Sequence, residues 1–274
     1  MKKVAIIPAR MASSRFPGKP MELIHGMPMI GHCFCRVSMC DQVDETYVAT
    51  CDVEIAEYIK SLGGTAIMTS DKHQRASDRA AEAMLKVEQA TGEKTDILIM
   101  VQGDEPMDTP SMISDALTPM LSDPDINVVN LMGEITSVGE FEDPNTVKVV
   151  TDLTGNALYF SREAIPSRRK GIDAVPMHKQ ICIIPFRRDY LLKYNALEET
   201  PLEIIESVDM MRILENGESV RMVKTKEPSY GVDTQEDLIL VEQKMARDLL
   251  MPRYLGRNHD CQQGHLLFSD EYSD

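Results

Sequence analysis

The stretch VAIIPARMASSRFPGKP, residues 4–20, joins a short apolar segment to a strongly basic loop. The apolar segment predicts a buried strand over Lys3–Pro8. The loop that follows contains Arg10, Arg15 and Lys19 and no acidic residue. Because the whole chain carries a formal net charge of -15, this concentration of positive charge is the first feature that points to a function.

The next hundred residues alternate short apolar runs with segments of helical spacing. Strands are predicted at 46–51, 65–70 and 96–104, and helices at 28–40, 53–64, 77–92 and from 110 onward. Ser77 is predicted as the N-cap of the third helix, and Thr109 with Pro110 as the start of the fourth. Such alternation is typical of an α/β fold with a mainly parallel mixed sheet flanked by helices.

The pattern changes after about residue 125. Strands are predicted at 126–135, 179–186 and 220–227, a hairpin around Gly155 at 147–162, and single helices at 201–217 and 234–250. Thr234 is the predicted N-cap of the last helix. We therefore predict one α/β domain over residues 1–250, followed by a tail over 251–274 that shows no periodicity.

Composition narrows the classes of function. The acidic net charge argues against a nucleic-acid-binding protein, because phosphate backbones are bound by basic surfaces. The sequence contains no run of 18 or more apolar residues that could span a membrane. Its N-terminus lacks the apolar stretch of a signal peptide. We expect a cytoplasmic protein whose six cysteines are reduced thiols.

Four neighbouring side chains could form a metal cluster: His32, Cys33, Cys35 and Cys40. However, this segment is predicted to be helical, and residues two apart point to different sides of a helix. Zinc ligands are normally separated by two or more intervening residues. Buried helical thiols are therefore the favoured interpretation.

The basic loop follows the first predicted strand, which is where open α/β sheets bind ligands. Arginine forks onto phosphate oxygens and lysine acts as a point charge. Gly18 and the small residues at 12–14 allow the backbone to approach a ligand closely. These features suit a bound polyphosphate, although a solvated surface loop is an equal alternative on composition alone. The chain has neither a dinucleotide-binding nor a P-loop glycine motif.

Two acidic segments complete the candidate site. QGDEP at 102–106 follows the most apolar predicted strand, and its Asp104 is suited to Mg²⁺, which prefers one or two carboxylates plus phosphate oxygens. YGVDTQEDL at 230–238 offers Asp233 as a second carboxylate. The alternatives are a strand-closing turn at Gly103 and a loop acid beside the Thr234 cap.

Five segments together resemble the 3-deoxy-manno-octulosonate (Kdo) cytidylyltransferases over about residues 3–246. They occur in the family's order and rough spacing: IIPARMASSRFPGKP, QGDEP, DPNTVKVV, ALYFSREAIP and GVDTQEDL. The resemblance implies a nucleotide-diphospho-sugar transferase-like fold, with an antiparallel sugar-acid and dimerisation portion at about 126–230, and commonly a homodimer. It also implies that CTP activates a 2-keto-3-deoxy sugar acid, giving the CMP-sugar and pyrophosphate.

The same resemblance assigns roles to residues on the nucleotide side. Arg10, Arg15 and Lys19 would contact the CTP phosphates, and the backbone of Pro8 and Ala9 would frame the cytosine. Asp104 and Asp233 would hold Mg²⁺, and the catalytic group would comprise Lys19, Asp104 and Arg10. Arg75 and Ser77 would lie near the phosphates or base, and Gln102 near the nucleotide–sugar junction.

On the acceptor side, Arg162 and His178 match positions that face the sugar acid, and we add Lys179 and Asp209 as candidates. His178 could instead be a surface or core histidine, and Lys179 part of a solvated edge. The chain also departs from the family here. It has RASDR (75–79) for SGTER, HKQICIIPF (178–186) for HLGIYGY, and Asp209-Met210 for Glu-Gln.

The first change lies in a phosphate- or base-proximal loop. Because several changes fall together in the sugar-acid half, they suggest an acid other than plain Kdo. Nonulosonic, amino-substituted and phosphonate-bearing acids are the alternatives. A non-catalytic nucleotide-binding subunit is a further alternative, but such a protein would be expected to lose Lys19 or a metal-binding acid, and this chain keeps them.

Overall fold

The computed structural model describes residues 1–12, 16–170 and 175–255. Its strands are β1 (Lys3–Pro8), β2 (Leu23–Ile24), β3 (Met27–Pro28), β4 (Glu45–Thr50), β5 (Thr65–Met68), β6 (Ile97–Val101), β7 (Val129–Glu134), β8 (Lys148–Thr151), β9 (Ala157–Ser161), β10 (His178–Ile181), β11 (Ile183–Arg187) and β12 (Arg221–Lys224). Its helices are η1 (Lys19–Met21), α1 (Met29–Ser38), α2 (Val53–Ser61), α3 (Ala76–Thr91), α4 (Pro110–Ser122), α5 (Val138–Glu142), α6 (Arg188–Asn195), α7 (Pro201–Glu206), α8 (Met210–Glu215), α9 (Gln235–Met245) and α10 (Pro252–Leu255).

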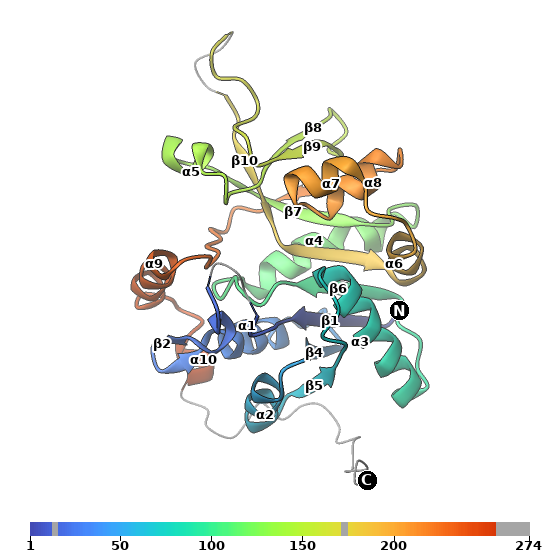
Figure 1. The fold of residues 1–274 in the computed structure, drawn as a ribbon, viewed down its shortest axis with the longest axis vertical. Helices are drawn as coiled ribbons and strands as arrows, with labels where there is room; N and C mark the ends of the chain where they lie inside the picture. Colours follow the sequence, from blue (N-terminus) through green and yellow to red (C-terminus); the bar gives the residue numbers. More distant parts are fainter. Residues whose placement is uncertain (13–15, 171–174, 256–274) are drawn as a thin grey trace.

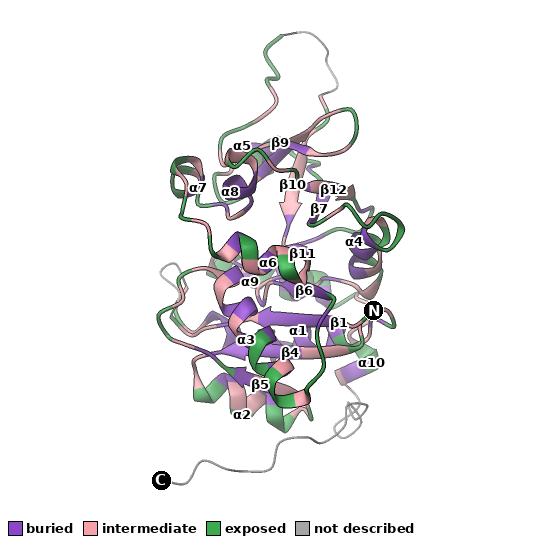
Figure 2. Cartoon of the chain, turned by 90° about the vertical axis from the view of Figure 1, so that its right-hand side faces the viewer, coloured by how far each residue is buried: buried purple, intermediate pink, exposed green. Residues whose placement is uncertain are grey.

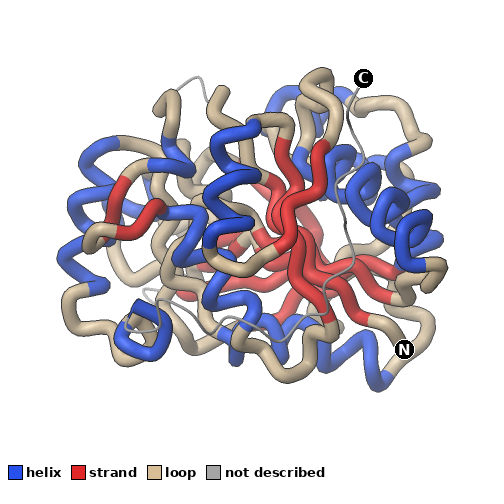
Figure 3. The backbone as a smooth tube through the Cα atoms, turned by 90° about the horizontal axis from the view of Figure 1, so that it is seen from below, coloured by secondary structure: helices blue, strands red, loops and turns tan. Residues whose placement is uncertain are grey.

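The first sheet has the strand order β11-β6-β1-β4-β5. Its strands are parallel except β11, which pairs antiparallel with β6. Alternate residues of β1 enter two different cores, since Ile6 packs with α3 and Ile7 packs with α1, α2 and α4. Helices therefore cover both faces of this sheet (Figure 1; Figure 3), and β1 and β4 are mainly buried between them (Figure 2). This arrangement confirms the predicted α/β layering.

The second sheet has the order β12-β7-β10-β8-β9 and lies above the first in Figure 1. Only β12 and β7 are parallel, and the other pairs are antiparallel. The β8–β9 hairpin turns at Gly155, whose φ of 85° favours glycine. The antiparallel portion predicted after residue 125 is thus confirmed.

The strand predicted at 179–186 is in fact two strands in two sheets. β10 belongs to the second sheet and β11 to the first, and the chain changes sheets at Cys182. Backbone bonds explain the change: the Cys182 N–H donates to Glu105 Oε1 at 3.1 Å, and its carbonyl accepts from the Gln102 N–H at 3.2 Å. Residues that follow β6 therefore hold the chain at the point where it passes from one sheet to the other.

The helix predicted at 201–217 is also wrong as a single element, because α7 and α8 are separate. Ser207 between them has a φ of 52°, a left-handed conformation that ends α7. The Arg162 guanidinium donates to the carbonyls of Glu206 and Ser207, which supports this break. The helix predicted to reach residue 250 ends at Met245, whereas its Thr234 cap is confirmed.

Two further predictions need correction. Ser77 lies inside α3, whose N-cap is Arg75, and its hydroxyl donates to Asp209 instead of capping the helix. The tail predicted from residue 251 is wrong for residues 251–255, because Pro252–Leu255 is helical and Tyr254 is buried. Residues 256–274 lie outside the described part of the chain.

The thiol prediction for α1 is confirmed. Cys33, Cys35 and Cys40 are buried thiols, the first two within α1 and the third just after its end at Ser38. His32 bonds to Tyr254 and to the Ile24 carbonyl. Within the described residues, no group of three or more His, Cys, Asp or Glu side chains could hold a metal ion. None of the described helices is long and apolar enough to cross a membrane.

Candidate active site

The site is built from loops at the carboxyl ends of β1 and β6, two neighbouring parallel strands. Gly103 allows these loops to approach, since a Cβ there would lie 2.9 Å from Ile30 Cδ1 and 3.2 Å from the Pro8 carbonyl. Gly18, with φ 77°, precedes η1 and turns the chain so that Lys19 enters a buried position. Close packing of both loops thus brings basic and acidic residues together.

Lys19 is the point on which three segments converge. Its Nζ donates to Asp104 Oδ2 at 2.7 Å, to the Val232 carbonyl at 2.6 Å and to Asp233 Oδ1 at 3.4 Å. The Val232 N–H in turn donates to the Asp104 carbonyl at 2.9 Å. Residues that lie 85 and 213 positions from Lys19 in the sequence therefore contact the same ammonium group.

The electrostatics of this group keep Lys19 charged. Burial lowers its pKa, but the Asp104 charge and hydrogen bond, followed by those of Asp233, outweigh burial and raise the pKa above its usual value. The side chain is only 10% exposed, whereas those of Asp104 and Asp233 are 28% and 29% exposed. The cation is thus enclosed, and both carboxylates remain partly open to an incoming ligand.

The carboxylate pair fits the requirements of Mg²⁺. Two oxygens that both lie within 3.4 Å of one nitrogen face the same small volume. Mg²⁺ is commonly held by one or two carboxylates, while phosphate oxygens and water complete its octahedron. Asp104 and Asp233 could therefore hold this ion together with a polyphosphate.

Arg10 lies in the loop after β1. Arg10 Nη1 donates to the His73 carbonyl at 3.3 Å, which ties the loop after β1 to the loop after β5. Ala9 is buried and its N–H donates to the Ala49 carbonyl, while Pro8 is half-buried at the end of β1. Arg15 lies outside the described residues.

Arg75 and Ser77, predicted on the nucleotide, contact Asp209, predicted on the acceptor. Arg75 Nη1 lies 3.3 Å from Asp209 Oδ1, and the Ser77 hydroxyl donates to Asp209 Oδ2 at 3.1 Å. Arg75 also pairs with Glu199 at 2.9 Å and approaches Glu203 at 3.7 Å. Burial raises the pKa of Asp209, and the Arg75 charge acts against this rise. The two halves of the predicted site therefore meet at one ion pair.

The other predicted acceptor residues make contacts within the protein. Besides its bonds to α7, Arg162 donates to the Pro144 carbonyl at 2.9 Å. Lys179 donates to Glu140 Oε1 at 2.6 Å and to the Ser229 carbonyl at 2.8 Å. His178 is half-buried in β10, and burial followed by the Lys224 charge lowers its pKa. Their contact with an acid stays a prediction.

The comparison with known families now bears on this geometry. A model of the cytidylyltransferase family matches residues 4–220, a span that includes Lys19 and Asp104. The chain belongs to the cytidylyltransferase family. It is therefore an enzyme that transfers a cytidylyl group, and its basic loop and acidic loop lie at the carboxyl ends of strands, where open α/β sheets bind ligands.

Several relatives of this cytidylyltransferase have names that specify a substrate. The chain is 40% identical over 257 residues to the 3-deoxy-manno-octulosonate cytidylyltransferase of Geobacter metallireducens, covering 90% of this chain and 99% of that one. It is 41% identical over 250 residues to the enzyme of the same name from Syntrophotalea carbinolica, covering 88% and 98%.

Solved structures agree on the fold. A CMP:2-keto-3-deoxy-manno-octonic acid synthetase complexed with CTP has a TM-score of 0.82 and 39% identity, covering 91% of this chain and 100% of that chain. A cytidylyltransferase from Leptospira borgpetersenii has a TM-score of 0.61 at 15% identity and supports the fold alone. The predicted fold class is confirmed.

One buried polar residue of this cytidylyltransferase was missed in the sequence analysis. Arg79 is buried, donates to Thr69 Oγ1 at 2.6 Å, and its Nη2 has no hydrogen-bond partner among the described residues. It lies four residues before Ala83 and eight before Val87, both buried, so an arginine on the apolar stripe of a helix was the available signal. Glu105 stands in the predicted QGDEP segment, and its carboxylate accepts hydrogen bonds from the Cys182 N–H at 3.1 Å and the Ser229 hydroxyl at 2.8 Å.

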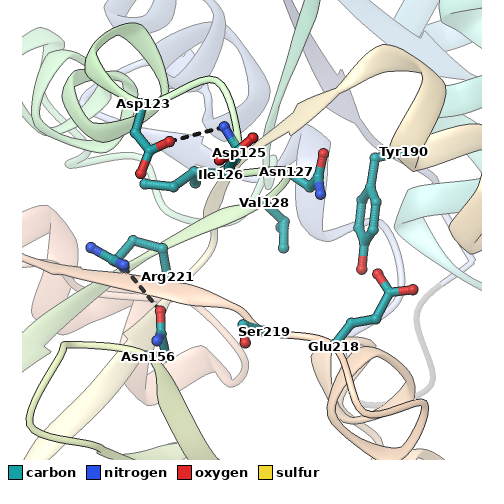
Figure 4. A pocket seen from close by; sticks show the side chains of 10 residues that line it. All are labelled: Asp123, Asp125, Ile126, Asn127, Val128, Asn156, Tyr190, Glu218, Ser219 and Arg221. Atoms are coloured by element: carbon teal, nitrogen blue, oxygen red, sulfur yellow. Dashed lines mark hydrogen bonds between the residues drawn. The ribbon is translucent and has the colours of Figure 1, made fainter.

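A cavity of about 400 Å³ lies elsewhere in the molecule, at the amino ends of β7 and β12 (Figure 4). Its lining comprises Asp123, Asp125, Ile126, Asn127, Val128, Asn156, Tyr190, Glu218, Ser219 and Arg221. None of the predicted site residues belongs to this lining, so the cavity is distinct from the Lys19 site.

Proposed function

We propose that this cytidylyltransferase transfers CMP from CTP to a Kdo-like 2-keto-3-deoxy sugar acid and releases pyrophosphate. The observation that carries the proposal is the convergence of Asp104 and Asp233 on Lys19. The names of the relatives and the CTP complex of the similar synthetase support the choice of nucleotide and acceptor class.

In the proposed reaction the anomeric hydroxyl of the acid attacks the α-phosphorus of CTP. The new oxygen–phosphorus bond forms as the bond to the β-phosphate oxygen breaks, and the hydroxyl proton leaves to solvent. Lys19 and Arg10 would neutralise charge on the phosphates, and Asp104 and Asp233 would hold Mg²⁺. When bound, Mg²⁺ would neutralise phosphate charge and lower the pKa of the attacking hydroxyl. The chain's task is then mainly positioning.

The second candidate acceptor is an acid other than plain Kdo. The structure reduces the number of residue changes that support it. Ile183 and Ile184 are buried in β11, so these departures from the family pattern belong to the core. Cys182 and Asp209 remain as changes that could alter the acceptor site. Their polar groups differ from the family's aromatic hydroxyl and Glu-Gln pair, and unpaired polar groups in a site discriminate strongly between acceptors.

A panel of acceptors with Mg²⁺ and CTP tests the proposal through pyrophosphate release. Kdo, an amino-substituted Kdo, a nonulosonic acid and a phosphonate should be compared by kcat/KM. We expect turnover with a 2-keto-3-deoxy sugar acid, and the ranking identifies which one. Absence of pyrophosphate release with every acid would contradict the proposal, and a preference for the phosphonate would replace its acceptor class.

We further propose a homodimer that works in the cytoplasm. The resemblance to the family supports the dimer, and the reduced thiols at Cys33 and Cys40 support a reducing compartment. Light scattering on the purified protein should give twice the monomer mass, and a monomer at working concentration would contradict the dimer.

A further inference from the structure

The segment after α9 packs against α1 in one of the two large hydrophobic cores. Asp248 is largely buried and pairs with Arg36 on α1. Tyr254 on α10 is also buried, its ring stacks edge-on against His32, and the Arg36 guanidinium lies 5.7 Å from the ring centroid. Figure 1 shows α10 beside α1 and β2. Residues 246–255 are called the C-terminal strap below.

The donor and acceptor in each hydrogen bond of the strap follow from the chemistry of its groups. Arg36 Nε can only donate, so the Tyr254 oxygen accepts from it at 3.1 Å. The Tyr254 hydroxyl hydrogen is then available to His32 Nδ1 at 2.8 Å. His32 must therefore carry its hydrogen on Nε2, which donates to the Ile24 carbonyl at 2.9 Å. Burial, and after it the Arg36 charge, lowers the pKa of His32 to about 4, which agrees with a neutral ring.

This network ends on both loops of the site. Ile24 closes β2, only a few residues after Lys19. Arg36 Nη1 donates to the Met107 carbonyl at 3.3 Å, three residues after Asp104. One buried cluster thus contacts the chain that carries the lysine and the chain that carries the first carboxylate. Lys19 itself bonds to Asp104, Val232 and Asp233, none of which belongs to the cluster.

We propose that the C-terminal strap holds the Lys19 and Asp104 loops at their working separation, with Tyr254 as its positioning residue. The proposal rests on the proposed function for its kinetic consequence. A buried network whose members are all hydrogen-bonded specifies one arrangement, and leaving a buried donor or acceptor unpaired loosens it. Loss of the Tyr254 hydroxyl removes the acceptor of Arg36 Nε and the donor to His32 Nδ1 together.

The test compares Tyr254→Phe with Tyr47→Phe. Tyr47 is also buried, and its hydroxyl donates to Glu45 Oε2 at 2.7 Å at the start of β4, remote from Lys19. Hydrogen–deuterium exchange of the free protein is measured at residues 19–24 and 104–108. We expect exchange there to be about tenfold faster in Tyr254→Phe and unchanged in Tyr47→Phe.

The kinetic readout separates positioning from general loss of stability. Tyr254→Phe should raise KM for CTP and the half-saturating Mg²⁺ concentration by about tenfold, because a lost buried hydrogen bond is worth about a factor of ten. KM for the acid should not change, and Tyr47→Phe should leave all three values unaltered.

Two outcomes would overturn the strap: unchanged exchange at residues 19–24 and 104–108, or an equal effect of both substitutions. If the wild-type protein fails to bind Mg²⁺ and CTP in calorimetry, the proposed function fails instead. The exchange measurement still decides the strap in that case, because it needs no ligand.

Discussion

The two sides of the candidate site use their charged residues differently. On the side of the first sheet, Asp104 and Asp233 are partly open and both contact the enclosed Lys19. On the side of the second sheet, Arg162 bonds to three carbonyls and Lys179 to Glu140 and a carbonyl. The first side has acidic groups that a cation and a phosphate could share, whereas the second holds its cations in internal contacts.

This difference separates groups available for chemistry from groups that shape the protein. A carboxylate near a lysine can exchange that partner for a metal ion and phosphates at little cost. An arginine bonded to several backbone carbonyls would have to give up those bonds to bind an acid, and each lost bond has a cost. Charge-removing substitutions on the two sides should therefore affect different measurements.

The largest effect is expected from Asp104→Asn, which keeps the side-chain shape and removes the charge. We expect CMP transfer to fall about 1,000-fold, on the order of 4 kcal/mol in the barrier, because metal binding and phosphate neutralisation both suffer. Pyrophosphate release at saturating Mg²⁺ measures the effect. Glu54→Gln, an exposed acid in the first turn of α2, is the matched control and should retain full activity. Near-normal turnover of Asp104→Asn would remove the metal role from this side.

Lys19→Met should reduce kcat about 100-fold, as expected for removal of one group that stabilises transition-state charge. The substitution also leaves Asp104 and Asp233 close together without the cation between them. We therefore expect tighter Mg²⁺ binding in the absence of CTP, measured by calorimetry, alongside the slower turnover. Weaker Mg²⁺ binding would show that Lys19 holds the carboxylates in place and does not compete with the ion.

How far the sequence predicts these two sides depends on which contacts decide each residue's role. Lys19 and Asp104 could be placed because each follows an apolar strand of a parallel sheet, and such strand ends meet at one edge. The sheet change at Cys182 could not, because it depends on Glu105, 77 residues away. The same holds for Ser77. Local capping rules predict an N-cap there, whereas its hydroxyl donates to Asp209, 132 residues away in the sequence.

Arg162→Ala should mainly affect stability. Its guanidinium bonds to Pro144, Glu206 and Ser207 carbonyls, so truncation should cost about 2 kcal/mol and lower the melting temperature by several degrees. KM for the acid should rise less than it would if Arg162 contacted the acid directly. Calorimetric melting with acceptor kinetics measures both. A large rise in acceptor KM at unchanged melting temperature would instead place Arg162 on the acid and erase the contrast between the sides.

The smallest effect is expected from Arg75→Gln, at the point where the two sides meet. Because Arg75 pairs with Asp209 and Glu199 on the acceptor side, its loss should raise KM for the acid about fivefold, in keeping with a partly exposed ion pair. KM for CTP should stay within about twofold. Arg221→Gln, on β12 and bonded to Asn156, removes an equivalent charge away from Asp209 and serves as the control. A rise in KM for CTP alone would return Arg75 to the nucleotide side, and the boundary between the two sides would then run between Arg75 and Asp209.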